Sequence, residues 1–293
     1  MPRLDREVHN VLVIANLHKA RAGDAADSVA RALESRGVST HVFKFEGKPD
    51  GPPEGEYDLA FSLGGDGTVL YASRILSHKG TPIIGVNMGD FGFLTEITED
   101  EWLEAFENYR AGKLAIAERI IQLVRVFRNG TQIADFVGLN DAVITAAGIA
   151  KIIRLTVGLQ NVSLGHYRAD GIIVATPTGS TAHSAAAGGP ILDPRVDAMI
   201  INPICPFTLS HRPIVVPGSE TIEIGVDEQQ RTEVLMTVDG QIVMPLEPGD
   251  RVVIGRADYC ARIVRALKRD FYDVLRGKLK WSGEPGPSTE EEL

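Results

Sequence analysis

The chain has 293 residues, of which 44% are hydrophobic and 24% charged, the proportions of an ordinary globular protein. Its length fits two domains. A formal net charge of −9 argues against a general nucleic-acid-binding role, so an anionic substrate would need a local group of basic residues. The cysteines, Cys205 and Cys260, lack metal-ligand spacing and are expected to be unpaired thiols in a reducing compartment.

No segment has the apolar core of a signal peptide, and no apolar run approaches the length that spans a membrane. We therefore expect a cytoplasmic protein that binds neither nucleic acid nor a membrane.

The first third of the chain alternates between strand-like and helix-like segments. The strand-like runs cover residues 10–15, 38–45, 58–63 and 82–86, and the helix-like runs cover 24–36 and 69–76. Thr98 and Glu101 have the spacing of a capping box, which predicts a helix from there to Tyr109. This alternation predicts an α/β fold, with a Rossmann-like parallel sheet in a nucleotide-binding domain over residues 1–112.

The pattern changes after Gly112. Asn129-Gly130 is a strong hairpin signal between strand-like runs at 119–128 and 132–137. Further strand-like runs follow at 152–157, 171–175, 198–202, 221–226, 233–238 and 251–255. They predict a mainly antiparallel β domain over 113–261. Residues 262–276 are expected to form a helix, with 262–281 packing back on the first domain, and 282–293 to form a disordered tail.

The most informative motif is Gly64-Gly65-Asp66-Gly67-Thr68, between a buried-strand pattern and a helix pattern. Glycines at such a junction let a phosphate approach the backbone and the helix N-terminus. Asp66 would repel that phosphate unless it acts on a neighbouring hydroxyl, as a general base or an orienting group, which indicates a kinase. The alternative is a tight turn in which Asp66 or Thr68 caps the helix. Neither the Walker-A motif nor the dinucleotide fingerprint is present.

Further polar motifs lie in the second half of the chain. Residues 176–184 combine several hydroxyls with small side chains and can bind a polar ligand at close range, or form a surface loop. Asn140-Asp141 suits the paired hydroxyls of a ribose, or forms a turn. Asp239-Gly240 is explained by hairpin chemistry alone. His183 could stack on a base or fill space, and the cations that could neutralise phosphate or lie on the surface are Lys151, Arg154, Arg168 and Arg212.

In order along nearly the whole chain, these segments resemble the NAD kinase family. The segments that carry the resemblance are 64–68, 87–94, 140–141, 167–192 and 239–241, and residues 170–184 are the most specific. The resemblance implies phosphorylation of the adenosine-ribose 2′-hydroxyl of NAD to give NADP. It also implies a Rossmann-like first domain, a β-rich second domain, a site between them, and a homodimer or homotetramer in which a neighbouring subunit contributes to some sites.

The resemblance also assigns roles to residues. Asp66 matches the proposed proton acceptor, Gly67 lies against the nucleotide, and Asn140 with Asp141 matches the pair that binds the nicotinamide-side ribose. The other positions expected to contact the cofactor are Lys151, Arg168, Asp170, Thr181, Ala182, His183, Ser184, Ala185, Ala186 and Gln241.

The chain departs from the family pattern at a few positions. Asp141 stands where glutamate is usual, which shortens the reach to the ribose by a methylene. His183 replaces a common tyrosine, and Tyr71 occupies a position that is often basic. None of these changes the proposed base.

The sequence has no compact acidic cluster for a dedicated metal site, so Mg²⁺ is expected to arrive with the phosphoryl donor. The donor is ATP, another triphosphate or polyphosphate. A lipid kinase shares the glycine–aspartate loop, but the residues after Thr68 differ from the asparagine–glutamate pair typical of that class. A non-catalytic NAD(H)-binding sensor on the same scaffold is the second alternative.

Overall fold

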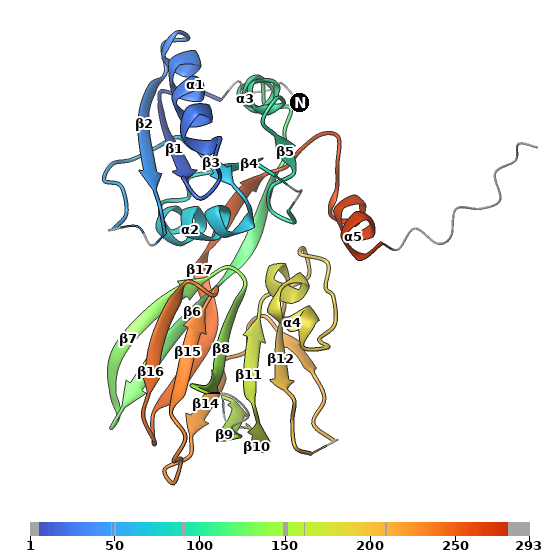
Figure 1. Ribbon diagram of the computed structural model, residues 1–293. Helices are drawn as coiled ribbons and strands as arrows, with labels where there is room; N and C mark the ends of the chain where they lie inside the picture. Colours follow the sequence, from blue (N-terminus) through green and yellow to red (C-terminus); the bar gives the residue numbers. More distant parts are fainter. Residues whose placement is uncertain are drawn as a thin grey trace, which may run out of the picture. The chain divides into compact units, whose positions relative to one another are not determined.

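The computed structural model describes residues 6–47, 49, 51–89, 92–148, 152–160, 162–208 and 210–280. They form two compact units. Unit 1 takes its described residues from Met1–Ala72, Thr81–Ala117 and Ile263–Leu293, and unit 2 from Ser73–Gly80 and Glu118–Arg262. Figure 1 labels their elements. The tail expected at 282–293 lies outside the described residues.

Unit 1 is built on a parallel sheet. Its strands are β1 (Asn10–Asn16), β2 (Ser39–Phe45), β3 (Leu59–Gly64), β4 (Ile83–Asn87) and β5 (Ile97–Thr98). β1 pairs with β2 and β3, β3 with β4, and β4 with β5, and each of these pairs is parallel. The predicted parallel sheet is therefore confirmed. Its central strands are buried on both faces, which explains why they are continuous apolar runs in the sequence.

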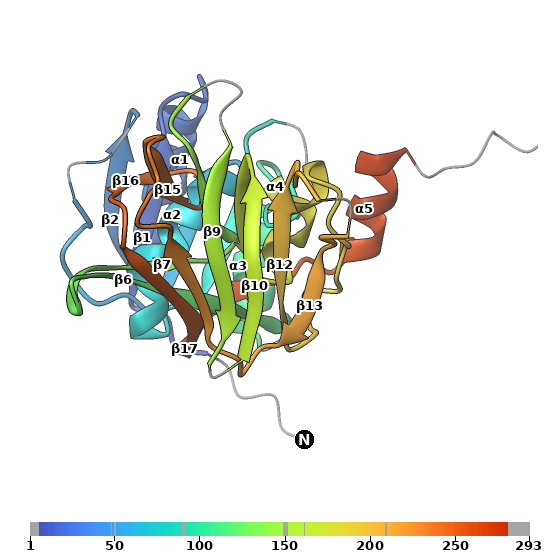
Figure 2. The same cartoon turned by 90° about the horizontal axis from the view of Figure 1, so that it is seen from below.

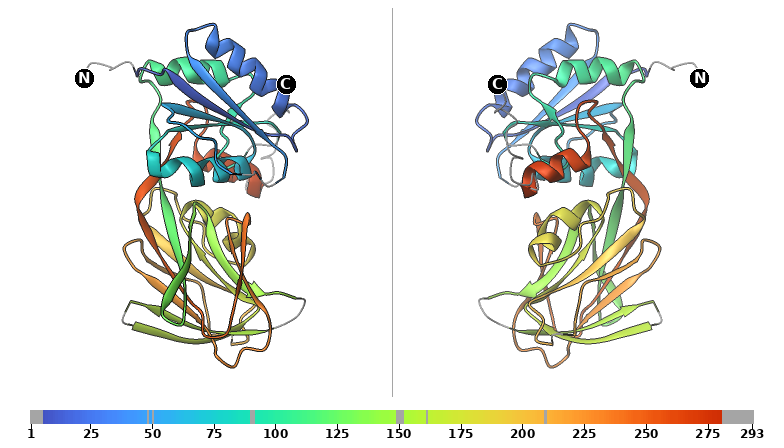
Figure 3. Two further views of the ribbon diagram at one scale, coloured as in Figure 1. Left: turned by 90° about the vertical axis from the view of Figure 1, so that its left-hand side faces the viewer. Right: turned by 90° about the vertical axis from the view of Figure 1, so that its right-hand side faces the viewer.

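Helices cover both faces of this sheet. They are α1 (Ala22–Glu34), α2 (Asp66–Leu76) and α3 (Trp102–Arg110). In both views of Figure 3, α1 and α3 lie on one side of the strands and the beginning of α2 on the other. Val29, Phe61 and Phe106 belong to one hydrophobic cluster, which joins α1, β3 and α3. Residues 73–76 of α2 belong to unit 2.

Two predicted helix boundaries are wrong. The helix α3 begins at Trp102, because Thr98 is held in β5, although Glu101 Oε2 still accepts the Thr98 N–H at 3.0 Å. In the region 262–276, the first residues instead finish a strand, β17 (Arg251–Val264), and Ile263 pairs with Ile83. The helix there is α5 (Phe271–Leu279), which begins after Asp270 in a reciprocal capping box with Asp273.

Unit 2 consists mainly of antiparallel strands. One sheet has the order β13 (Ile214–Pro217), β12 (Ala198–Ile204), β11 (Gly171–Ala175), β8 (Asp141–Ala146), β15 (Val234–Val238) and β16 (Ile242–Leu246). Figure 2 shows β12 beside β13 and β9 beside β10. The other group has β10 (Val162–Ala169), β9 (Ile153–Leu159), β14 (Ile222–Val226) and β17 as neighbours, with β6 (Ile116–Arg128) paired to β17 and β7 (Thr131–Gly138).

The two groups of strands share one core. Val124, Ile144, Ile201 and Ile254, from β6, β8, β12 and β17, are fully buried members of a single hydrophobic cluster. The hairpin predicted at Asn129-Gly130 is confirmed: both residues have positive φ, 50° and 79°, between paired strands β6 and β7. The sequence had missed β5, β8, β10, β13 and β16. None of the helices in the described part of the chain has the length and apolarity needed to cross a membrane.

Candidate functional site

In unit 1, the glycine–aspartate loop places Asp66 as the first residue of α2, directly after β3. Its carboxylate is half-buried and accepts hydrogen bonds from the loop that follows β4. Oδ2 accepts the Phe93 N–H at 2.8 Å, and Oδ1 accepts the Leu94 N–H at 2.9 Å and the Thr95 hydroxyl at 3.2 Å. Asp66 is thus held in one position by the backbone of a neighbouring loop, at the carboxyl ends of two parallel strands.

Small residues make this arrangement possible. A Cβ on Gly64 would lie 2.2 Å from Thr68 Oγ1, whereas a Cβ on Gly65 would meet nothing within 4 Å, so the backbone at Gly65 faces open space. Gly67 is exposed in the first turn of α2. These features suit close approach of a ligand to the N-terminal end of α2.

Two buried polar groups lie beside this loop without a hydrogen-bond partner among the described residues. They are Thr68 Oγ1 and Asn87 Nδ2. Asn87 is paired with Gly64 in register, and its Oδ1 accepts the Gly89 N–H at 2.8 Å. Unsatisfied buried donors are costly, and a role in catalysis or in binding a ligand is one explanation for keeping them.

Tyr71, at a position where the resemblance leads us to expect a basic residue, is a buried structural residue. Its hydroxyl donates to the Gly51 carbonyl at 3.0 Å, and its ring packs on Phe43 and Phe45 with centroid distances of 6.1 and 5.1 Å. It therefore anchors α2 on β2.

In unit 2, the predicted ribose-binding pair lies in the turn that leads into β8. Asn140 is half-buried and Asp141 is buried, with 4% of its surface exposed. The carboxylate of Asp239 accepts the N–H groups of this turn: Leu139 at 2.9 Å, Asn140 at 2.7 Å and Asp141 at 3.2 Å. Asp239 and Gly240 form the hairpin turn between β15 and β16, with φ of 53° and 64°. The hairpin interpretation is confirmed, and the side chain has a further role that the sequence did not indicate.

The two carboxyl groups of this turn perturb one another. Burial, and secondarily the charge of Asp239, raises the pKa of Asp141 to about 7. Burial also raises the pKa of Asp239, while the three N–H donors and the charge of Arg74 act in the opposite direction. The donors and Arg74 favour the ionised form of Asp239, and the charge of Asp239 disfavours ionisation of Asp141.

The hydroxyl-rich loop begins next to the same turn. Thr176 Oγ1 donates to the Leu139 carbonyl at 2.5 Å, and the Thr176 N–H donates to the Asn140 carbonyl at 2.9 Å. A Cβ on Gly179 would lie 2.1 Å from the Asn140 carbonyl oxygen, so the two segments are in direct backbone contact. The structure therefore brings together Asn140, Asp141 and the loop after β11.

The remaining loop residues follow in a 3₁₀ turn (Thr178–Thr181) and the short helix α4 (His183–Ala186). Ser184 is buried, and Asn202 Nδ2 donates to its carbonyl at 2.9 Å and lies 3.3 Å from its hydroxyl. His183 is exposed at the first position of α4, so its ring is available for stacking. Thr181, Ala182 and Ala185 are half-buried, and Ala186 is exposed.

Gln241 joins the site through Arg74. Arg74 Nη1 donates to Gln241 Oε1 at 2.9 Å, and both residues belong to unit 2. The positive charge of Arg74 also acts on the pKa of Asp239, in the lowering direction. The sequence had offered other cations for the site and had missed Arg74.

Asp170 and Arg168 are not brought to this turn within one chain. In register, Ala175 lies opposite Asp141, whereas Gly171 lies opposite Thr145 at the other end of β8. The length of β11 therefore separates Asp170 from the Asn140-Asp141 turn by roughly 17 Å. Arg168 is exposed in β10, with its guanidinium 5.0 Å from the Phe207 ring centroid. Lys151 lies outside the described residues.

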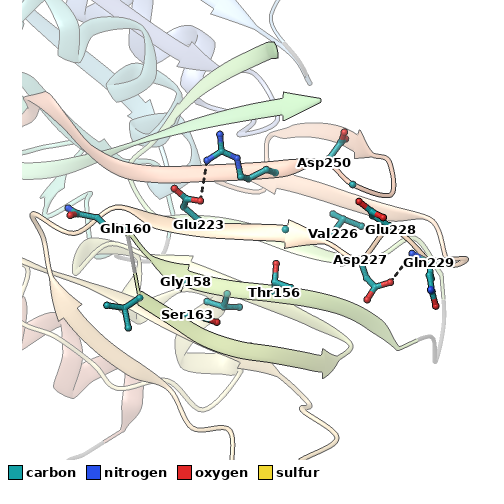
Figure 4. A pocket seen from close by; sticks show the side chains of 15 residues that line it. Thr156, Gly158, Gln160, Ser163, Glu223, Val226, Asp227, Glu228, Gln229 and Asp250 are labelled. Carbon is teal, nitrogen blue, oxygen red and sulfur yellow. Dashed lines mark hydrogen bonds and ion pairs between the residues drawn. The ribbon is translucent and has the colours of Figure 1, made fainter. Parts of the chain in front are cut away.

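A cavity of about 780 Å³ lies on β9, β14 and the start of β17 (Figure 4). Two of its lining residues, Glu223 and Arg251, form an ion pair of 3.1 Å. None of the predicted site residues lines it. Because its lining lacks the glycine-rich and hydroxyl-rich loops, the cavity does not mark the predicted site. Among the described residues, no group of three or more His, Cys, Asp and Glu could hold a metal ion.

A parallel α/β unit with a glycine–aspartate loop, followed by an antiparallel unit with a hydroxyl-rich loop, defines a phosphotransferase class of enzyme, and the comparisons with known proteins identify its family. Residues 51–114 match the family model of the ATP-NAD kinase N-terminal domain, and 139–266 match that of the ATP-NAD kinase C-terminal domain. The chain belongs to the NAD kinase family.

Curated relatives agree over almost their full length. The NAD kinase of Treponema denticola is 38% identical over 94% of this chain and 98% of its own, and that of Treponema pallidum is 41% identical over 93% and 90%. An NAD kinase from Archaeoglobus fulgidus, solved in complex with ATP, has a TM-score of 0.71 at 26% identity, covering 94% of this chain and 100% of its own. Yeast NADH kinase, solved with NADH, has a TM-score of 0.83 at 22% identity. The match covers 95% of this chain and 89% of the yeast chain, and it shows that the two share a fold.

Proposed function

We propose that this chain transfers the terminal phosphoryl group of ATP to the 2′-hydroxyl of the adenosine ribose of NAD, giving NADP and ADP. A bond forms between the 2′-oxygen and the γ-phosphorus, the bond from that phosphorus to the bridging oxygen breaks, and the 2′-hydroxyl proton passes to Asp66. The observation that carries the proposal is the fixed Asp66 carboxylate, held by Phe93, Leu94 and Thr95 beside the glycine loop.

In unit 2, Asn140 and Asp141 would bind the nicotinamide-side ribose, because an amide and a carboxyl group can satisfy two adjacent hydroxyls. The polar and small residues from Thr181 to Ala186, together with Gln241, would bind the rest of the dinucleotide. The contact of Gly179 with the Asn140 carbonyl supports this grouping, since it fixes the loop next to the ribose-binding turn.

Mg²⁺ would enter as part of the MgATP substrate, where it neutralises charge on the phosphates. The ATP complex of the Archaeoglobus fulgidus relative supports ATP as the donor, and polyphosphate remains the alternative to test.

Asp170 lies at the far end of β11 from the Asn140-Asp141 turn, roughly 17 Å away, and Arg168 lies two residues before it in β10. We propose that they serve the site of a neighbouring subunit in a homodimer or homotetramer, together with Lys151. We also propose that the protein is located in the cytoplasm.

The test is the formation of NADP from NAD, ATP and Mg²⁺, measured with a coupled dehydrogenase, for the wild type and for Asp66→Asn. The variant should lose on the order of 10²-fold or more in kcat, because an amide cannot accept the proton. Asp58→Asn is a matched control: Asp58 also accepts two backbone N–H groups in unit 1, from His9 and Asn10, and it should leave kcat near the wild-type value. Near-normal turnover by Asp66→Asn would remove the base role.

The same assay separates the alternatives. A sensor that binds NAD(H) without chemistry would give binding by calorimetry but no NADP. A lipid kinase would instead consume ATP only when lipid micelles are supplied.

A further inference from the structure

The turn that carries Asn140 and Asp141 is held from both sides by groups outside it. On one side, a single carboxylate of Asp239 accepts three successive N–H groups at 2.7–3.2 Å. On the other side, Thr176 binds both the Leu139 and the Asn140 carbonyl. These contacts satisfy nearly every N–H and carbonyl group of the turn's backbone. The side chains of Asn140 and Asp141 are therefore not needed to satisfy it.

These contacts connect segments far apart in the sequence. Asp239 lies about 100 residues after the turn, and Thr176 lies 37 residues after Leu139. Asp239 is 8% exposed and Thr176 is fully buried. A charged hydrogen bond in such surroundings is stronger than one in water, and its geometry is fixed by the packing around it.

Asp239 also carries a cost that a purely structural hydrogen-bond acceptor would not. Its negative charge lies next to the buried carboxyl group of Asp141, and like charges in a buried site destabilise one another. An asparagine or a serine could accept N–H bonds without that repulsion. The arrangement is therefore better explained by a requirement for three aligned acceptor contacts and for control of the protonation of Asp141.

We propose that Asp239 is a positioning residue for NAD: its carboxylate fixes the turn at Leu139–Asp141 so that Asn140 and Asp141 present their side chains to a ribose. The inference rests on the proposed function, because it assigns Asp239 to the ribose-binding pair. Asp239 itself contacts the turn, and its effect on the reaction is transmitted through Asn140 and Asp141.

Asp239→Asn tests this proposal. The amide has only one acceptor oxygen, and its NH₂ group opposes at least one of the backbone N–H donors. We expect KM for NAD to rise about tenfold or more, with KM for ATP within about twofold of the wild-type value. Hydrogen–deuterium exchange should become faster at the amides of residues 139–141. Asp250→Asn is the control, because Asp250 is also a buried carboxylate of unit 2, and it binds Arg128 and the Glu247 N–H instead of the turn.

The pH profile supplies a readout that a merely structural role would not change. The charged groups that act on the Asp141–Asp239 pair are the two carboxyl groups themselves and Arg74. Protonation of Asp141 near pH 7 removes acceptor capacity, so KM for NAD in the wild type should increase as the pH falls from about 8 to about 6. Without the charge of Asp239, the pKa of Asp141 falls but stays raised by burial, so this dependence should move to lower pH in Asp239→Asn.

The outcomes are distinct. The proposal is overturned if Asp239→Asn is folded and keeps the KM for NAD and the pH profile of the wild type. It is also overturned if the variant has a lower Tm and its kcat/KM values for NAD and for ATP fall by the same factor. Should Asp239→Asn not fold, Thr176→Val decides, because it loosens the same turn by removing the hydroxyl bond to the Leu139 carbonyl, together with the one from the Gly179 N–H. An unchanged KM for NAD in that variant also overturns the proposal. A wild type that forms no NADP would instead refute the proposed function, and the exchange at residues 139–141 would still be measured.

Discussion

Gly92 and Asp66 leave no room for a side chain between them. A Cβ on Gly92 would lie 1.9 Å from Asp66 Oδ1 and 2.4 Å from its carboxyl carbon. The Gly92 N–H also donates to Thr95 Oγ1 at 3.1 Å, which in turn binds Asp66. The loop after β4 thus encloses the carboxylate at the distance that only glycine permits.

Gly92→Ala should therefore displace Asp66 from its donors. We expect kcat to fall about tenfold or more, because a small displacement of a catalytic group is costly in rate. Steady-state kinetics would measure it. Gly277→Ala is the control in the same unit, since a Cβ at this position in α5 meets nothing within 4 Å, and alanine favours the helix. Wild-type kcat in Gly92→Ala would mean that Asp66 is not required in its present position.

Gly179→Ala tests the contact between the hydroxyl-rich loop and the Asn140-Asp141 turn. The new Cβ would lie 2.1 Å from the Asn140 carbonyl oxygen, a backbone atom that cannot rotate away. We expect KM for NAD to rise roughly tenfold, and Tm to fall by several degrees as the two segments separate.

Gly255→Ala provides the comparison for that variant. A Cβ at position 255 would have its nearest neighbour, Thr221 Oγ1, at 3.8 Å, which is an ordinary contact in the same unit. Equal effects of the two substitutions on KM would show that the contact at Gly179 has no particular role in NAD binding.

The sequence predicted the elements whose pattern is local. β1, β3 and β4 are apolar runs because they are buried on both faces, and Asn129-Gly130 marks its hairpin because both residues adopt positive φ. β8 was missed because it begins inside the Asn140-Asp141 motif, which has the composition of a turn. The boundary of α3 was wrong because pairing of β5 overrides the local capping signal at Thr98.

The site was harder to predict wherever it depends on contacts between distant segments. Asp239-Gly240 has the composition of a hairpin turn, and nothing local indicates which N–H groups its carboxylate will accept. Asp170 and Thr181 are close in sequence, yet the extended strand β11 carries them apart. Arg74 was missed because its partner Gln241 lies 167 residues away.

Asp141 should make the stability of unit 2 depend on pH. Burial and the charge of Asp239 raise its pKa from 3.8 to about 7, so its stabilising contribution is complete below 3.8 and is lost as the pH rises through about 7. Asp141→Asn removes this loss. Relative to the wild type, the variant should gain a few kcal/mol in the free energy of unfolding between about pH 5 and about pH 8.

Urea denaturation at the two pH values would measure this difference. Asp135→Asn, at an exposed position of β7, should show no such change. If wild type and Asp141→Asn kept the same difference at both pH values, the Asp141 carboxyl group would not be perturbed by its surroundings.

Glu101 should have the opposite pH dependence in unit 1. Its carboxylate accepts hydrogen bonds from Arg269 at 2.9 Å and from the Thr98 N–H at 3.0 Å, and Lys268 lies at 3.3 Å. The hydrogen bond from Arg269 is the largest cause that lowers the pKa of Glu101 from 4.5 to about 2. A lowered pKa stabilises the fold above 4.5, and this contribution is lost as the pH falls through about 2.

Glu101→Gln should therefore destabilise the protein at neutral pH by roughly 1–2 kcal/mol. The value is modest because the Lys268 side chain is exposed, and water weakens its attraction for the Glu101 carboxylate. The penalty should shrink below about pH 4.5, because Glu101 of the unfolded chain then takes up a proton while the folded carboxylate stays ionised down to about pH 2. Glu104→Gln is the control: Glu104 is 60% exposed at its side chain and pairs with Lys268 at 3.4 Å, so its loss should have little effect. A penalty for Glu101→Gln that is equal at pH 7 and pH 3 would show that its charge does not anchor the segment before α5 to α3.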